Sequence, residues 1–239
     1  MLNIVHKNLK LNGNDLLILE FLSKFGYCQQ SHLLKLLNLY NNTSSITLGK
    51  ILKKLIKLDL IVIKSIFTDR NDFILLTNEG CRQMGVNKVK DIVLNSIYHD
   101  MLVIDILLYL KKINPNLNIQ TDKEIKRITG FKLFEKNKIN IPDLLVDSSI
   151  AIEVELTAKS QDRLIEIINS YICQIEIKEV HYYVLNESIA DRIISLNINN
   201  KFKFFKFDKE MINVEEYLPN KTLINMANNV SYNLDNYLK

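Results

Sequence analysis

Apolar and polar positions follow the periods of amphipathic helices and strands along most of the chain. In the first third, apolar residues recur every three or four positions and then give way to two β-prone runs. The predicted helices cover residues 15–24, 30–39 and 45–58, and the predicted strands cover residues 60–67 and 72–76. Ser44 or Ser45 can cap the third helix, and residues 68–71 supply the turn of a hairpin.

The remainder of the chain mixes helices and strands. The predicted helices cover residues 91–113, 158–176 and 188–196, and strands are predicted at 117–120, from 142 to a polar turn at 148–149, and at 150–157, 180–185 and 202–207. The fold class is therefore α+β. Three helices and a hairpin, the order of a winged helix-turn-helix domain, span residues 1–88, and an α/β layered domain spans residues 89–210. Residues 211–239 form a C-terminal tail without a motif.

Composition and charge refine this picture. The 239 residues are 47% hydrophobic and 24% charged, which is typical of a folded globular protein. The net charge of +4 is uneven, because residues 1–90 hold 13 Lys and Arg against 6 Asp and Glu, while the remainder holds 18 against 21. A phosphate-binding module joined to an acidic, metal-binding module would show this asymmetry, and a lysine-rich solvated surface would show it too.

Four lysines of the third predicted helix are spaced i, i+3, i+4 and i+7, so they form one basic stripe. In a winged helix the third helix enters the major groove with its N-terminal residues nearest the bases. The expected base-proximal residues are Ser44, Ser45, Thr47 and Lys50; the expected phosphate contacts are Lys53, Lys54 and Lys57; the expected wing-tip contact is Arg70. A solvated helix face and a protein-docking module are the alternatives.

Residues 141–163, IPDLLVDSSIAIEVELTAKSQDR, place acids in a stretch suited to a buried sheet. Glu153 and Glu155 are two apart on a predicted strand and share a face, and Asp143 lies beside them if the two strands pair. Buried carboxylates repel each other and lose hydration unless a cation compensates. Hard oxygen ligands suit Mg²⁺ or Mn²⁺, so this cluster is a candidate metal site. An edge strand with solvated acids is the alternative.

The spacing of Pro142-Asp143 and Glu153-Val154-Glu155 resembles the PD-(D/E)xK nuclease signature, with Glu155 in the position usually held by lysine. Lys159, expected on the first turn of the next helix, is the candidate for a lysine that has moved. The block EVELTAKSQDR is similar to the replication-relaxation proteins and the MOBC-type plasmid relaxases, which join an N-terminal winged helix to a nuclease-like domain. The likeness spans roughly residues 10–210.

This resemblance implies a restriction-endonuclease-like (PD-(D/E)xK) domain that cleaves DNA with Mg²⁺ or Mn²⁺. The implied catalytic residues are Asp143, Glu153, Glu155 and Lys159, and the implied metal ligands are Asp143, Glu153, the Val154 carbonyl and Glu124. Arg163 would lie near phosphate, and His99 on the long helix is an additional candidate. For Glu124 and His99 an ordinary structural role is the alternative.

The implied function is nicking of double-stranded DNA at a plasmid transfer or replication origin. Other mobilisation or replication proteins are further expected partners, and a homodimer is left open. The alternative is a catalytically inactive DNA-binding initiator or accessory protein, because Glu155 replaces the lysine. A transcriptional regulator would leave the acidic cluster unexplained.

Cysteine usage and hydropathy bear on the compartment. The three cysteines are odd in number and widely spaced, which predicts neither a disulfide framework nor a zinc site. The most hydrophobic run, residues 101–110, is interrupted by Asp105 and is too short to span a bilayer. We therefore expect a cytoplasmic protein without a membrane partner.

Overall fold

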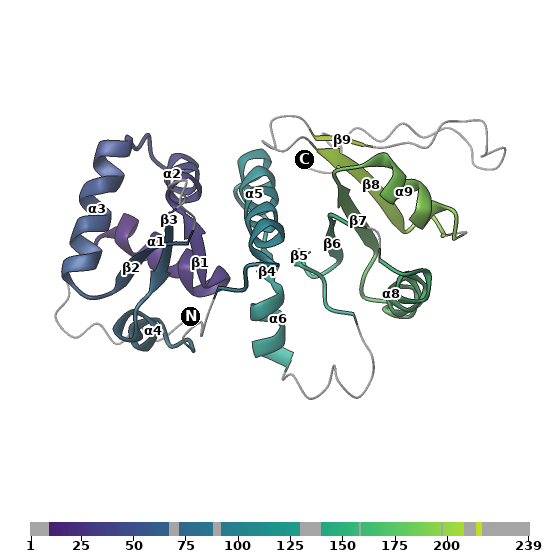
Figure 1. Cartoon of the computed structure of the whole chain (residues 1–239), viewed down its shortest axis with the longest axis horizontal. Helices are drawn as coiled ribbons and strands as arrows, with labels where there is room; N and C mark the ends of the chain where they lie inside the picture. The colour runs from purple at the N-terminus through teal and green to yellow at the C-terminus, as the bar shows by residue number, and fades with distance from the viewer. Residues whose placement is uncertain are drawn as a thin grey trace. The chain divides into compact units, whose positions relative to one another are not determined.

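The computed structural model describes residues 10–66, 72–87, 92–129, 140–157, 159–196, 198–207 and 214–216. The chain divides into two compact units, Met1–Leu108 and Tyr109–Lys239, and the boundary falls within one helix. The described residues form a mixed α+β structure with a three-stranded sheet and a six-stranded sheet (Figure 1). The predicted α+β class is therefore confirmed, and the sequence-based boundary at residue 88 precedes the shared helix.

The first three helices begin and end close to the predicted positions. They are α1 (Gly13–Phe25), α2 (Gln30–Asn38) and α3 (Ser45–Lys57), and α4 (Asn78–Met84) and most of α5 (Ile97–Ile113) complete the first unit. Ser44 caps α3 as predicted, because its hydroxyl accepts a hydrogen bond from the Thr47 amide at 3.2 Å. Asn12 caps α1 in the same way through the Asp15 amide.

The sheet of the first unit is antiparallel, in the order β1-β3-β2. Its strands are β1 (Tyr27–Gln29), β2 (Ile61–Ser65) and β3 (Asp72–Leu76). The predicted hairpin is present as β2 and β3. The sequence did not predict β1, because three residues are too few to show an alternating pattern. Arg70 and the rest of the hairpin turn lie outside the described residues.

The backbone before β2 packs closely against α4 in this unit. Gly80 of α4 lies against Leu60, the residue before β2, and a Cβ at Gly80 would be 2.0 Å from the carbonyl oxygen of Leu60. The same oxygen accepts a hydrogen bond from the Thr77 amide at 3.1 Å. Glycine is therefore required by the close approach of two backbone segments.

The second unit contains a mixed sheet in the order β4-β5-β6-β7-β8-β9. Its strands are β4 (Ile119–Thr121), β5 (Leu144–Val146), β6 (Ile150–Glu155), β7 (Glu179–Val184), β8 (Phe202–Phe207) and β9 (Val214–Glu216). The helices are α6 (Asp122–Thr129), α8 (Gln161–Cys173) and α9 (Glu187–Ile194). The three central strands β6, β7 and β8 are parallel, and the outer pairings are antiparallel.

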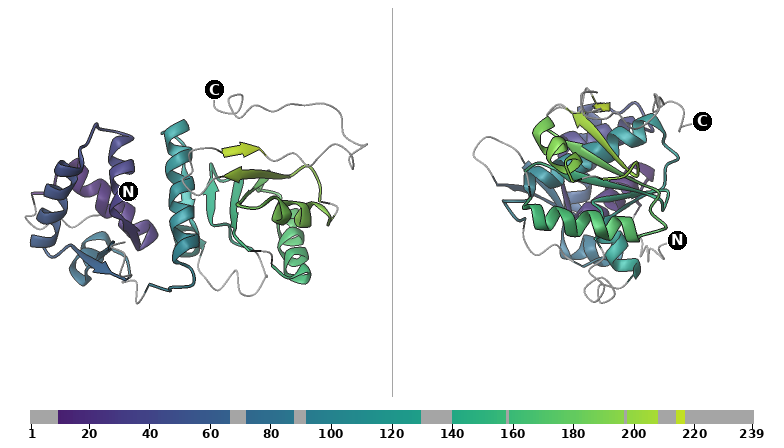
Figure 2. Two further views of the ribbon diagram at one scale, coloured as in Figure 1. Left: turned by 45° about the horizontal axis from the view of Figure 1, so that its top comes forward. Right: turned by 90° about the vertical axis from the view of Figure 1, so that its right-hand side faces the viewer.

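Helices α8 and α9 cover one face of this sheet (Figure 2). Helix α8 connects β6 to β7, and α9 connects β7 to β8. Both are crossover connections between parallel neighbouring strands that move in the same direction across the sheet. Crossovers of the same handedness place their helices on the same face of the sheet. The core that they form contains Ala151, Leu164, Ile168, Tyr171, Val180, Tyr182, Val184, Ile189 and Phe204. Ala151 thus identifies the face of β6 that lies under α8.

Three details of the predicted helices are wrong. Helix α5 begins at Ile97 instead of residue 91, and Val93 before it is 60% exposed. Helix α8 begins at Gln161 instead of residue 158, because the Ser160 side chain caps it. The apolar periodicity of the predicted helix over residues 158–176 places Ile172 on the inward face, but Ile172 is 45% exposed, since the buried stripe ends at Tyr171.

In the described ranges, no helix is both long and apolar enough to cross a membrane. The cysteines Cys28, Cys81 and Cys173 are free, and the first two are buried.

Candidate functional site

The pairing of β5 with β6 gathers three acids on one face. Leu144 lies opposite Ile152 and Leu145 opposite Ala151, so continuing the antiparallel register by two positions from Leu145 places Asp143 opposite Glu153. Alternation along β6 puts Glu153 and Glu155 on the face of Ala151, under α8. The strand pairing on which the predicted acidic cluster depended is present.

Glu153 is buried and is held by two donors. Its Oε1 accepts hydrogen bonds from the Tyr171 hydroxyl and from Asn140 Nδ2, the latter at 2.7 Å. Asn140 Nδ2 also donates to the Tyr171 hydroxyl at 2.9 Å, so the three side chains form one network. Burial, and next the negative charge of Asp143, raise the pKa of Glu153 to about 8. This carboxyl therefore holds a proton at neutral pH unless positive charge is added.

Glu155 and Lys159 form an ion pair at the end of β6. The Glu155 side chain is 6% exposed and Lys159 is 35% exposed. Lys159 was expected on the first helical turn, but it precedes the cap Ser160 and so lies in the connection before α8. From there its ammonium reaches back to Glu155 Oε2. The acid in the usual lysine position is thus accompanied by a lysine from four residues later.

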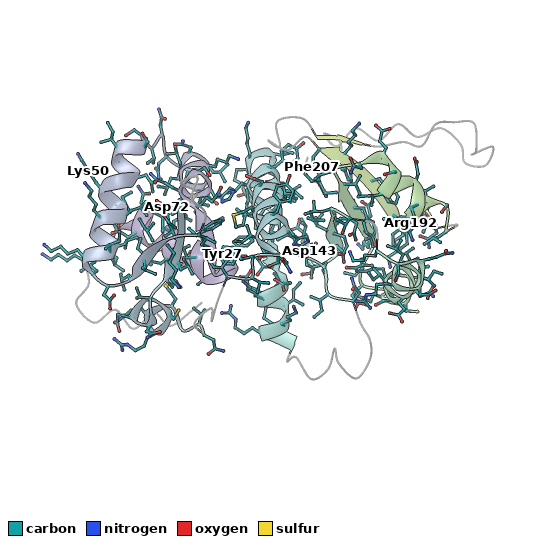
Figure 3. All side chains as sticks on the ribbon, in the orientation of Figure 1. Tyr27, Lys50, Asp72, Asp143, Arg192 and Phe207 are labelled. Atoms are coloured by element: carbon teal, nitrogen blue, oxygen red, sulfur yellow. The ribbon has the colours of Figure 1, made fainter. Side chains whose placement is uncertain are left out.

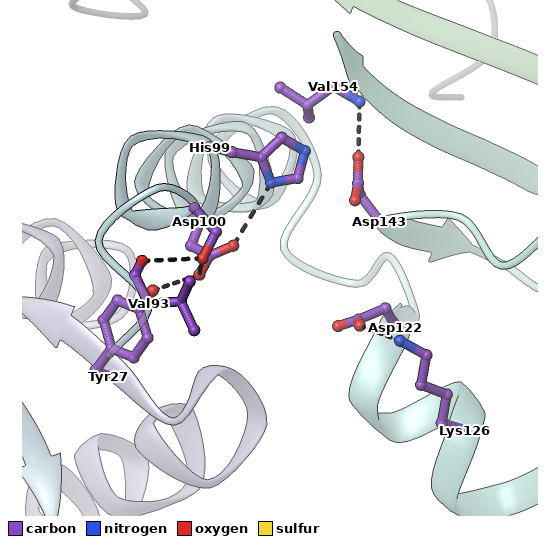
Figure 4. Close-up of polar contacts among 9 residues, drawn as sticks. Tyr27, Val93, His99, Asp100, Asp122, Lys126, Asp143 and Val154 are labelled. Carbon is purple, nitrogen blue, oxygen red and sulfur yellow. Dashed lines mark hydrogen bonds and ion pairs between the residues drawn. The ribbon is translucent and has the colours of Figure 1, made fainter. Parts of the chain in front are cut away.

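Asp143 accepts a hydrogen bond through Oδ2 from the Val154 amide at 2.8 Å (Figure 4). The amide and carbonyl of one strand residue point toward the same neighbouring strand. The Val154 carbonyl is therefore directed to the side of β6 on which Asp143 lies, as a metal ligand at this position would require. Asp143 is partly exposed, whereas Glu153 and Glu155 are buried.

The oxygen donors of the acidic cluster match a divalent cation in chemical type but not in their present arrangement. Among the described residues, no group of three or more His, Cys, Asp or Glu side chains is arranged as a metal site, because the acids are turned toward partners within the protein. Their chemistry nevertheless fits Mg²⁺ or Mn²⁺, since two neighbouring carboxylates and a carbonyl are hard oxygen donors. Burial, and next the charge of Asp143, raise the pKa of Glu153, so this carboxyl is the one that an added positive charge would ionise.

Glu124 and His99 have other contacts. Glu124 Oε2 accepts hydrogen bonds from the Thr121 amide at 3.0 Å and from the Thr121 hydroxyl at 3.3 Å, and this arrangement caps the start of α6. His99 belongs to the first unit, on α5, where its Nδ1 lies 3.5 Å from Asp100 Oδ1 (Figure 4). Sequence order placed both residues with the acids, and the contacts described for them are local ones.

Helix α3 presents a polar, basic face to solvent. Its buried residues are Leu48, Ile51, Leu52 and Leu55. The exposed residues at its start and along its outer face are Ser44, Ser45, Ile46, Thr47, Lys50, Lys53 and Lys57. Figure 3 shows Lys50 pointing away from the helix into solvent. None of the three exposed lysines forms an ion pair with another residue of the described ranges. Their charge is therefore uncompensated.

Lys54 differs from the other lysines of the predicted stripe. Its ammonium is bound to Asp15, which is 0% exposed, and it donates a hydrogen bond to the Lys10 carbonyl at 2.9 Å. The expected phosphate contact is therefore committed to an internal ion pair. On a helical wheel Lys54 lies toward the α1 side of the stripe, which the spacing alone could not distinguish.

Arg163 lies on the first turn of α8 as expected, and its guanidinium pairs with Glu166 at 3.0 Å. Both side chains are 57% exposed, so this is a solvated surface pair of small energetic weight. A phosphate could replace Glu166 as its partner.

Sequence reasoning missed three residues of the site. Asn140 and Tyr171 bind Glu153, and Tyr182 of β7 lies beside Glu153 in the parallel register. Tyr171 lies on the mostly apolar face of the helix predicted over residues 158–176, and that pattern predicts packing alone. A tyrosine in an otherwise aliphatic buried stripe is the signal that was available, because a buried hydroxyl needs a hydrogen-bond partner.

Comparisons of the chain with protein-family models, with curated proteins and with solved structures find no match.

Proposed function

We propose that the protein is a Mg²⁺- or Mn²⁺-dependent DNA endonuclease that nicks double-stranded DNA at a plasmid transfer or replication origin, as relaxases do. The observation that carries this proposal is the convergence of Asp143, Glu153 and Glu155 at the carboxyl end of β6, with Lys159 beside them. Ligands of open α/β sheets bind at the carboxyl ends of the strands, so the acids are at the expected edge.

The element order supports a PD-(D/E)xK nuclease-like second unit. Strands β4, β5 and β6 are antiparallel neighbours, and α8 then leads to the parallel strand β7. This order and the motif at Asp143 and Glu153 agree with each other. In the first unit, three helices and a hairpin support a winged helix whose third helix, α3, would enter the major groove.

Each residue of the acidic site has a role in this proposal. Asp143, Glu153 and the Val154 carbonyl would hold the cation, which when bound activates water and stabilises charge on the attacked phosphate. Lys159 would stabilise the same developing charge from the solvent side, and Glu155 keeps its ammonium in place. Asn140 and Tyr171 fix the orientation of the Glu153 carboxylate.

The DNA contacts would come from the exposed face of α3. Ser45, Thr47 and Lys50 lie at or near its N-terminus, and Lys53 and Lys57 follow along the same face. Lys54 is removed from the expected contacts because it stabilises the buried Asp15. A surface with three uncompensated lysines favours phosphate binding that weakens as salt is added.

The test is a nicking assay on supercoiled plasmid that carries the DNA flanking the protein's own gene, with Mg²⁺ or Mn²⁺. Asp143→Asn and Glu153→Gln should abolish nicked product, while Glu176→Gln, an exposed acid after α8, should nick at the wild-type rate. Product that persists in both site variants would contradict the assignment of the cleavage site.

A second function is favoured by one observation. Each acid of the cluster has a partner within the protein: the Val154 amide for Asp143, Tyr171 and Asn140 for Glu153, and Lys159 for Glu155. A fold that has lost catalysis and serves as a DNA-binding replication or mobilisation accessory protein would show such internal compensation. This function predicts retarded migration of the flanking DNA, no nicked product with any divalent cation, and unchanged binding by Asp143→Asn.

A further inference from the structure

Tyr182 lies beside the acidic cluster on the neighbouring strand. In the parallel pairing of β6 and β7 it is the partner of Glu153, and alternation places its side chain on the same face. The residue is 1% exposed, and its ring stacks on Phe202 and Phe204 with centroid separations of 6.4 and 5.6 Å. Packing against these two rings therefore fixes the orientation of the Tyr182 ring and, with it, the position of its hydroxyl.

The Tyr182 hydroxyl has no hydrogen-bond partner among the described residues. A buried hydroxyl without a partner costs free energy, and most such groups in proteins are satisfied by protein or ordered water. Burial, and next the charges of the three carboxylates, raise the pKa of Tyr182. The hydroxyl therefore stays protonated and can donate a hydrogen bond toward the acids.

Tyr171 provides the contrast within the same core. Its hydroxyl is satisfied, because it donates to Glu153 Oε1 while Asn140 donates to the same oxygen. Both donors act on one side of the carboxylate. The second tyrosine, Tyr182, lies on the same face with a hydroxyl that no oxygen of the described residues accepts.

We propose that Tyr182 is a positioning residue whose hydroxyl donates to a water ligand of a divalent cation held by Asp143 and Glu153. This inference rests on the proposed function only through the cation. It adds a residue outside the motif, on β7, and explains why a hydroxyl without a partner is retained next to three carboxylates. Partners of this kind around a metal site commonly change its affinity 10- to 100-fold.

Tyr182→Phe separates a structural role from a positioning role. Removing a hydroxyl that lacks a partner should leave the metal-free protein as stable as the wild type or more stable, because no hydrogen bond is lost. The same change should weaken Mn²⁺ binding about 10- to 100-fold by isothermal titration calorimetry. Tyr183→Phe is the matched control: Tyr183 is the next residue of β7, is equally buried, and points to the opposite face of the sheet. It should leave Mn²⁺ affinity unchanged.

Terbium luminescence supplies a second readout that needs no DNA. The chain has ten Tyr and no Trp, so Tb³⁺ emission excited through the protein reports nearby tyrosines. At saturating Tb³⁺, this sensitised emission should fall in Tyr182→Phe and persist in Tyr183→Phe. Glu153→Gln should weaken Tb³⁺ binding itself, as measured by direct excitation of the ion.

The outcomes distinguish this inference from the proposed function. Unchanged Mn²⁺ affinity in Tyr182→Phe would overturn the inference and would assign the hydroxyl to an ordinary buried water, even if the protein nicks DNA. Absence of Mn²⁺ and Tb³⁺ binding by the wild type would overturn it as well. Weakened cation binding in a protein that does not nick DNA would support the inference and contradict the nuclease function.

Discussion

Lys54 in the first unit and Lys159 in the second make the same contact in two different settings. Their side chains are 37% and 35% exposed, and each ammonium is bound to a buried carboxylate, Asp15 or Glu155. Asp15 is accompanied by the neutral Asn12 at the start of α1. Glu155 shares its face of the sheet with Glu153 and Asp143.

The two ion pairs differ in the number of carboxylates that lie close to each lysine. In the first unit one ammonium balances one carboxylate, so the pair completes the local structure. In the second unit one ammonium faces three carboxylates, and burial, and next the negative charge of Asp143, raise the pKa of Glu153. The first pair is therefore structural, whereas the second belongs to the cluster at which we propose that a cation binds.

The largest effect is expected from breaking the balanced pair. Lys54→Met leaves the charge of Asp15 buried without a cation, which should lower the free energy of unfolding of the first unit by about 3 kcal/mol. Chemical denaturation followed by circular dichroism measures this loss. Lys53→Met, on the exposed face one residue earlier, should change stability by less than about 0.5 kcal/mol. Equal stability of the two variants would show that the pair is not structural.

The acidic cluster should make the free energy of unfolding depend on pH. Because the pKa of Glu153 is raised from 4.5 to about 8, the folded protein keeps a proton that the unfolded chain releases across this interval. The contribution of Glu153 to stability is therefore full below pH 4.5 and is lost as the pH rises toward about 8. Glu153→Gln, which cannot ionise, should gain stability relative to wild type over the same range, by a few kcal/mol at the upper end.

Unfolding curves at a series of pH values, without divalent cations, measure this difference. Glu166→Gln, which removes an exposed carboxylate of α8, is the control. A constant difference between Glu153→Gln and wild type would contradict the raised pKa.

A smaller effect is expected from removing the lysine of the acidic cluster. Lys159→Met should lower stability by about 1–2 kcal/mol, less than Lys54→Met, because Glu155 lies at the end of its strand and is 6% exposed, whereas Asp15 is 0% exposed. Lys178→Met, an exposed lysine before β7, serves as the control for loss of charge. A loss equal to that of Lys54→Met would remove the distinction between the two pairs.

The exposed lysines of α3 should matter for DNA and not for folding. Lys50→Ala, Lys53→Ala and Lys57→Ala should each reduce the slope of log affinity against log salt by about 1, as expected for one lost phosphate contact. Fluorescence anisotropy with labelled flanking DNA at several salt concentrations measures the slope. Lys178→Ala should leave it unchanged, and an unchanged slope in all three variants would move the DNA-binding surface away from α3.

Much of this protein follows from local patterns. Helical spacing predicted α1, α2 and α3 and the side of α3 that is buried, because each helix needs only one apolar stripe facing a core. Alternation along β6 likewise predicted that Glu153 and Glu155 share a face. These conclusions require only the side-chain periodicities of a helix and of a strand.

Contacts between distant segments decided the rest. The sequence could not show that Lys54 reaches Asp15 or that Tyr171 and Asn140 hold Glu153, because each contact joins residues far apart in the chain. It also could not show that the Tyr182 hydroxyl has no partner within the described segments, since that depends on all neighbours of a buried atom. The sequence by itself determined which groups are present and which faces they occupy. Only the tertiary structure decided which charges are balanced, because compensation depends on distances and burial that local periodicity does not contain.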